Sequence, residues 1–75
     1  MELGRMIKEI RLHSFFSQEE FAQVLGVSYA TVNRWENGKT KPNIKAMKRL
    51  YEFCQNEEID VDIRKLGVRE IVMDK

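Results

Sequence analysis

The sequence predicts an all-α fold of four or five short helices, followed by a C-terminal segment of uncertain structure with some strand character. Apolar residues recur at helical spacing in three segments, near residues 3–10, 21–25 and 44–54. Between residues 16 and 42, residues that start helices and residues that end them alternate closely. The 75 residues are enough for one small domain.

The first helix is expected from its apolar stripe. Leu3, Met6, Ile7 and Ile10 follow the i, i+3, i+4, i+7 spacing of an amphipathic helix. This helix should end near residues 13–15, and Arg11 lies at the edge of its stripe.

The second helix has a start signal and a stop signal. Ser17 is a good N-cap, and Glu20 sits where it can complete a capping box. Gly26 follows at the position where a helix ends in a left-handed cap. The apolar residues expected on one face are Phe21, Ala22, Val24 and Leu25.

A third helix should follow after a very short turn. Ser28 is its N-cap candidate, the helix should run over residues 29–37, and Gly38 closes it. So short a turn makes the two helices cross steeply. This is a helix-turn-helix arrangement, whose second helix can enter the major groove of DNA.

The third helix has two chemically different faces. At about 100° per residue, Val32 and Trp35 point one way. The opposite face has residue types that read base edges, since Asn suits adenine, Arg suits guanine and Ala suits a thymine methyl. The candidate base-reading residues are Tyr29, Ala30, Asn33 and Arg34.

A fourth helix should begin after Pro42, with Asn43 as its cap. The residues expected in the core are Ile44, Met47, Leu50, Tyr51 and Cys54. The residues expected on the outer face are Lys45, Lys48, Arg49 and Glu52. Cys54 is better explained as a small buried residue than as a nucleophile, because no base is near it in the pattern.

Three sub-motifs resemble one known family. They are Ser17-Gln18-Glu19-Glu20-Phe21-Ala22, then Leu25-Gly26-Val27-Ser28, then Trp35-Glu36-Asn37-Gly38-Lys39 followed by Pro42. This sequence resembles the Cro and phage-repressor-like helix-turn-helix domains, the xenobiotic-response-element type of regulator, over residues 3–54. Phe21 stands where that family usually has Leu, and Trp35 stands where it usually has Ile or Leu. Both side chains remain bulky and apolar.

The resemblance implies a lambda-repressor-like fold and several residue roles. It implies that Arg11 and Glu36 form a structural ion pair, and that Gln18 hydrogen-bonds a DNA phosphate from a helix N-terminus. The basic loop after the third helix is also placed to contact phosphates. The full set of candidate phosphate contacts is Gln18, Ser28, Thr31, Asn37, Lys39, Thr40 and Lys41.

Composition excludes several other classes. The chain has no apolar run near the ~20 residues of a membrane span, no signal-peptide pattern, and a single cysteine with no zinc cluster. No cofactor or metal is expected, and a cytoplasmic location follows. Residues 1–55 have nine Lys and Arg against six Asp and Glu, whereas residues 56–75 have four against six. The basic excess therefore lies in the part expected to meet DNA.

The C-terminal segment differs from the rest. We expect a helix-turn-helix domain over residues 1–56 and an extension over residues 57–75. Apolar and charged residues alternate in residues 59–64, which suggests a strand, although Asp62 could instead cap a helical turn. Residues 68–73 are again strand-like. This segment could pack on its own domain or pair with another chain, and residues 59–73 are the candidate homodimer contact.

Together these observations predict a sequence-specific regulator of transcription, in particular a repressor that binds a palindromic operator on double-stranded DNA as a homodimer. Two related alternatives are an antitoxin, which would have a protein partner, and a controller of a restriction-modification system. A protein-interaction module on the same fold is the alternative from another class. An enzyme is not expected, because the sequence lacks a His-centred triad, a metal cluster and a phosphate-binding Gly loop.

Overall fold

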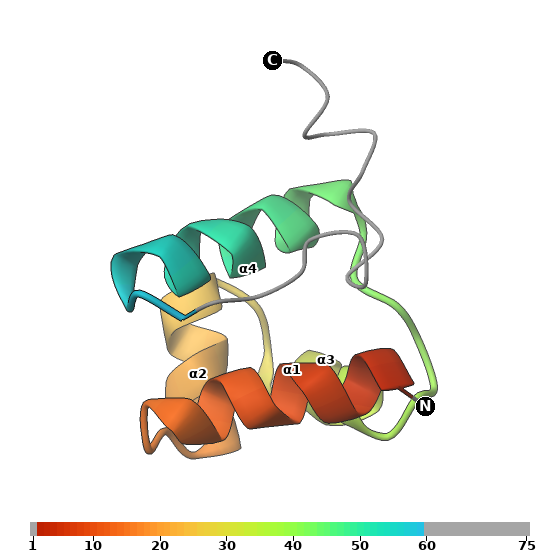
Figure 1. Cartoon of the computed structure of the whole chain (residues 1–75). Coiled ribbons are helices and arrows are strands. Elements are labelled where there is room, and N and C mark those ends of the chain that lie inside the picture. Colours follow the sequence, from red (N-terminus) through yellow and green to blue (C-terminus); the bar gives the residue numbers. More distant parts are fainter. Residues whose placement is uncertain (1, 60–75) are drawn as a thin grey trace. The chain divides into compact units, whose positions relative to one another are not determined.

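The computed structural model describes residues 2–59. That range contains four helices, α1 (Glu2–His13), α2 (Gln18–Leu25), α3 (Tyr29–Glu36) and α4 (Ile44–Asn56), as Figure 1 shows. The predicted all-α fold is confirmed, and residues 2–59 contain no strand. The strand and dimer predictions for residues 60–75 lie outside the described residues. None of the four helices combines the length and the apolar character needed to cross a membrane.

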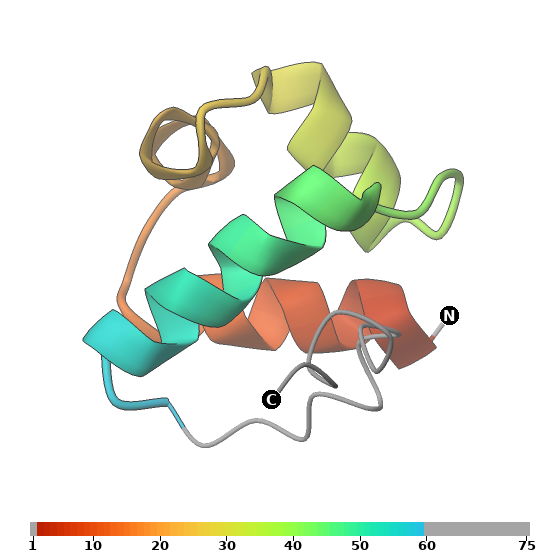
Figure 2. The ribbon, with the colours of Figure 1, turned by 90° about the horizontal axis from the view of Figure 1, so that it is seen from above.

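The chain divides into two compact units, Met1–Lys41 with α1 to α3 and Pro42–Lys75 with α4. In the first unit, α3 packs against both α2 and α1. Figure 2 looks nearly along α2 and shows α3 leaving the turn at a steep angle to it. The buried apolar residues of this unit are Ile7, Ile10, Phe21, Ala22, Leu25, Val32 and Trp35.

The ends of α2 and α3 have the caps that the sequence predicts. Ser17 Oγ accepts a hydrogen bond from the Glu20 N–H at 3.0 Å, and Glu20 Oε1 accepts one from the Ser17 N–H at 2.8 Å, which completes the capping box. Gly26 ends α2 with φ 73°, a left-handed value that glycine adopts without strain. Ser28 then caps α3. The tight turn between the two helices is therefore set by local chemistry.

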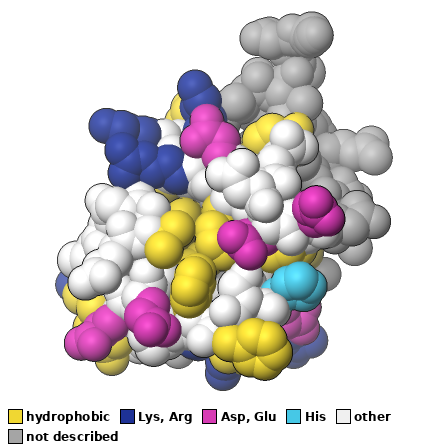
Figure 3. Space-filling view, turned by 90° about the vertical axis from the view of Figure 1, so that its left-hand side faces the viewer, with side chains coloured by type: hydrophobic (Ala, Val, Ile, Leu, Met, Phe, Trp, Pro, Cys, Tyr) yellow, Lys and Arg dark blue, Asp and Glu magenta, His cyan; other side chains and the backbone are white. Residues whose placement is uncertain are grey.

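Two apolar residues lie at the surface, one expected on the apolar face of the second helix and one expected in the core of the fourth. Val24 is 53% exposed on α2, and Ile44 is 67% exposed on α4. Val24 lies about 100° around the helix from the centre of the buried stripe formed by its neighbours. On α4 the buried stripe is centred on Leu50, about 120° from Ile44. Apolar side chains do reach the molecular surface among charged ones, as the face in Figure 3 shows.

The core of α4 also differs in its members. Met47, Leu50 and Cys54 are buried as predicted, but Tyr51 is only half-buried. Ala46 and Phe53 are buried in addition. The buried stripe of α4 is rotated by a fraction of a turn from the predicted one. The helical period alone does not say which edge of a broad apolar arc faces inward. Burial raises the pKa of the Cys54 thiol to about 11, so this thiol is a poor nucleophile at neutral pH.

Gly4 of α1 lies directly against the backbone at the end of α3. A Cβ atom placed on Gly4 would lie 2.6 Å from the Trp35 carbonyl oxygen and 2.8 Å from the Glu36 carbonyl oxygen. Both atoms belong to the backbone, so no side chain can rotate away to make room. Glycine therefore allows the two helices to approach this closely.

Gly4→Ala should lower the free energy of unfolding by about 1–3 kcal/mol, as expected for an added methyl group that forces a backbone shift. The loss should appear even though alanine is the better helix former. Urea unfolding measures it, with Lys8→Ala as the control at an exposed position of the same helix. A Gly4→Ala variant as stable as the parent would mean that α1 does not need this approach.

Candidate nucleic-acid interface

The outer face of α3 has the side chains expected to read bases. Tyr29 is 50% exposed, Ala30 and Arg34 are exposed, and Asn33 is half-buried. Val32 and Trp35 are buried on the opposite side of the same helix. The buried pair anchors α3 and leaves an aromatic, a methyl, an amide and a guanidinium on its outer side.

Two hydroxyl groups lie at the N-terminus of α3. Ser28 Oγ accepts a hydrogen bond from the Thr31 N–H at 3.1 Å and lies 2.9 Å from Thr31 Oγ1. Whichever oxygen donates in that second contact, one hydroxyl hydrogen remains free for another acceptor. The positive end of the helix dipole favours an anion here.

The C-terminus of α3 leads into a basic loop. Gly38 has φ 75°, and the Lys39 N–H donates to the Arg34 carbonyl oxygen at 2.9 Å, which closes the helix. Lys39, Thr40 and Lys41 follow, and all three are exposed. Two exposed ammonium groups therefore follow directly after α3.

An ion pair between Arg11 and Glu36 joins α1 to the C-terminal end of α3. Arg11 Nε lies 2.7 Å from Glu36 Oε2, and Arg11 Nη2 donates to Glu36 Oε1 at 3.0 Å. The two side chains are only 9% and 3% exposed. Arg11 Nη1 also donates to the Phe16 carbonyl oxygen at 2.9 Å, so the same guanidinium holds the segment between α1 and α2. This two-point contact fixes the end of α3 against α1.

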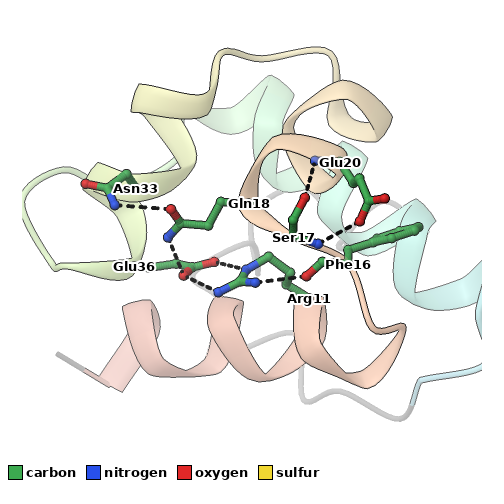
Figure 4. Close-up of polar contacts among 7 residues, drawn as sticks. All are labelled: Arg11, Phe16, Ser17, Gln18, Glu20, Asn33 and Glu36. Carbon is green, nitrogen blue, oxygen red and sulfur yellow. Dashed lines mark hydrogen bonds and ion pairs between the residues drawn. The ribbon is translucent and has the colours of Figure 1, made fainter.

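A series of side-chain hydrogen bonds continues from this ion pair through Gln18 to Asn33, as Figure 4 shows, and from there to Asn37. Gln18 Nε2 donates to Glu36 Oε1 at 2.9 Å. Asn33 Nδ2 donates to Gln18 Oε1 at 3.2 Å, and Asn37 Nδ2 donates to Asn33 Oδ1 at 3.1 Å. We call Glu36, Gln18, Asn33 and Asn37 the amide relay.

Comparison with known proteins agrees with this geometry. The helix-turn-helix family matches residues 7–60, which is more than half of the chain. The chain belongs to this family. It is therefore a helix-turn-helix DNA-binding domain of the Cro and phage-repressor type, the type that transcriptional regulators use.

Three relatives share the helix-turn-helix portion. The chain is 32% identical over 53 residues to the HTH-type transcriptional activator BcrR of Enterococcus faecalis, covering 71% of this chain and 26% of that protein. It is 42% identical over 54 residues to the Type II methyltransferase M.SsoII of Shigella sonnei, covering 68% and 14%. It is 40% identical over 62 residues to the Type II methyltransferase M1.ScrFI of Lactococcus lactis subsp. cremoris, covering 75% and 16%. The chain thus spans about a quarter or less of these relatives. No solved structure matches it significantly.

The helix-turn-helix places most of the candidate residues on one helix and the loop that follows it. It also links residues to which the sequence assigned separate roles. Gln18 and Asn37, expected at phosphates, both bond to Asn33, expected at a base. Only the spacing of Asn33 and Asn37, four residues apart in the helix predicted over residues 29–37, was a signal in the sequence. Nothing in the sequence pattern pointed to the contact of Gln18 with Asn33.

Proposed function

We propose that this chain is a sequence-specific transcriptional regulator that binds a palindromic operator as a homodimer and represses by occluding the promoter. The observation that supports this most directly is the exposed outer face of α3, which lies between a hydroxyl-bearing N-terminus and a loop with two lysines. Repression by occlusion needs only occupancy of the operator. Because one relative is named an activator, a reporter with the operator overlapping its promoter has to test the sign of regulation.

Base reading is assigned to four residues of α3. The Arg34 guanidinium can donate two hydrogen bonds to a guanine, and the Asn33 amide can pair with an adenine. Ala30 suits contact with a thymine methyl, and Tyr29 is exposed beside it. These are short-range contacts that distinguish one base pair from another.

Phosphate contact is assigned to groups on either side of that face. Lys39 and Lys41 supply charge, and Thr40 supplies a hydroxyl. The free hydroxyl hydrogen of the Ser28–Thr31 pair is available at the helix N-terminus. Gln18 and Asn37 each keep a second amide hydrogen that the relay does not use.

Dimerisation is proposed because one recognition helix reads only a few base pairs, which is too little for a genomic address. Two helices on one face of the duplex would sit about 34 Å apart, so that the operator is palindromic. Residues 59–73 remain our proposed dimer contact. Sedimentation of the chain alone and with its operator tests the dimer, and a monomer in both states would contradict it.

A duplex selected from a random pool allows the two classes of contact to be separated. Asn33→Ala and Arg34→Ala should each relax preference at particular base pairs by about 1–3 kcal/mol. Lys39→Ala and Lys41→Ala should weaken binding to all duplexes alike, and each should flatten the salt dependence by roughly one unit. Binding measured against salt for selected and scrambled duplexes gives both quantities.

The same binding measurements can also contradict these assignments. If Asn33→Ala and Arg34→Ala bind the selected duplex as tightly and selectively as the parent, the base-reading assignment is wrong. If the parent binds every duplex weakly and without a steep salt slope, the fold serves as a protein-interaction module instead.

A narrower candidate function is control of a restriction-modification system. Two relatives are named Type II methyltransferases, and they share with this chain their helix-turn-helix portion. Such a regulator would bind upstream of the genes of a methyltransferase and its nuclease. Placing those upstream regions among the test duplexes decides it, since selective binding there is expected and its absence removes this candidate.

A further inference from the structure

We propose that Glu36, acting through Gln18, sets which way the Asn33 side-chain amide faces, so that Gln18 and Glu36 are positioning residues for base recognition. This inference rests on the proposed function, in which Asn33 reads a base. It concerns the amide relay, whose members come from α2 and α3 and from the residue after α3.

The direction of the relay follows from the chemistry of a carboxylate. An ionised carboxylate only accepts hydrogen bonds, and Glu36 already accepts two from Arg11. Gln18 must therefore turn its NH2 group toward Glu36, which turns its oxygen away. That oxygen lies 3.2 Å from Asn33 Nδ2, so Asn33 in turn must present an N–H to Gln18. The charge on Glu36 thus decides the orientation of an amide that it does not touch.

The relay leaves Asn33 with one free donor and one free acceptor. A side-chain amide has two N–H groups and an oxygen with two lone pairs. In Asn33, Gln18 takes one N–H and Asn37 occupies one lone pair. An adenine in the major groove presents one acceptor, N7, and one donor, the N6 amino group. The free pair on Asn33 matches this edge, and a flipped amide would present donor and acceptor in the opposite order.

Burial makes the orientation persistent before DNA arrives. The Glu36 side chain is 3% exposed, and Gln18 and Asn33 are both half-buried, so water competes poorly for these hydrogen bonds. Asn37, at the far end, is exposed and can exchange its own contact with solvent. The fixed end of the relay is the ion pair, and the free end is at the candidate interface.

The test uses the full chain with Gln18→Met, which keeps the length of the side chain and removes both of its amide hydrogen bonds. The matched control is Gln23→Ala, a glutamine of the same helix that is exposed. Thermal melting first establishes that both variants fold, and Gln18→Ala serves as a second variant at the same position. Side-chain 15N relaxation of Asn33 in the free protein is the first readout. The adenine preference of the selected duplex at the Asn33 base pair is the second.

We expect Asn33 to have an ordered side-chain amide in the parent and in Gln23→Ala, and to lose that order in Gln18→Met. We also expect the adenine preference to fall about fivefold or more in Gln18→Met, corresponding to a weakened bidentate contact. Loss of a phosphate contact of Gln18 on its own would lower the affinity for every duplex by the same factor and leave the adenine preference unchanged. An ordered Asn33 amide, or an unchanged preference, in Gln18→Met overturns the relay. A parent without any base preference overturns the proposed function instead, and the relaxation data still decide whether the relay orders Asn33.

Discussion

Replacing Trp35 by alanine should lower the free energy of unfolding by about 3–5 kcal/mol. Trp35 is only 4% exposed, and the cavity left by its ring can be filled only in part by its neighbours. A domain of this size has a total stability near the lower end of about 5–15 kcal/mol. Trp35→Ala should therefore be largely unfolded or very close to it, as circular dichroism and thermal melting will show.

Tyr29→Ala is the control for this change. Tyr29 is an aromatic residue of the same helix, but it is 50% exposed. Its replacement should move the melting temperature little and should affect DNA binding instead. If Trp35→Ala melted at the temperature of the parent, α3 would have to face the other way, and the assignment of its outer face would fail with it.

Removing one partner of the Arg11–Glu36 pair should have an effect of similar size. Glu36→Ala leaves a guanidinium with little access to water and without its counter-charge, a change that costs about 3–5 kcal/mol when a buried pair is broken. Arg11→Ala should be equally harmful, because it also releases the Phe16 carbonyl. Denaturant unfolding at two salt concentrations measures the loss, which salt should hardly change because the pair is shielded from solvent.

The double change Arg11→Met with Glu36→Leu separates the loss of the ion pair from the cost of leaving one buried charge unpaired. Apolar replacement of both partners removes the uncompensated charge, so the double variant should be clearly more stable than either single variant. Additive losses would mean that the two side chains contribute independently. In that case the ion pair is not what holds the end of α3.

The sequence was a good guide wherever the determining chemistry is local. Ser17 with Glu20, Gly26, Ser28 and Asn43 each act within a few residues. They mark the starts of α2, α3 and α4 and the end of α2, as predicted. The buried side of α3 was also predictable, since only Val32 and Trp35 are apolar and bulky enough to anchor it.

The features that the sequence did not predict depend on how the helices pack against one another. The apolar arcs of α2 and α4 are wide, and Val24 and Ile44 fall on the edge that stays outside. The amide relay joins Gln18 to Asn33 across fifteen positions of chain, and no periodicity encodes such a contact. The DNA roles of the site residues remain predictions.

The shortness of α3 has a consequence for regulation. An isolated helix below about 12–15 residues is marginal in water, and α3 has only 8. A peptide of this segment should be a coil, so the DNA-facing surface comes into existence only with the folded unit. Any duplex that binds this surface therefore raises the free energy of unfolding, by about 2.7 kcal/mol when the free duplex concentration is 100 times Kd. If the proposed function holds, an operator would stabilise the folded chain, and unbound chains would be degraded faster than bound ones.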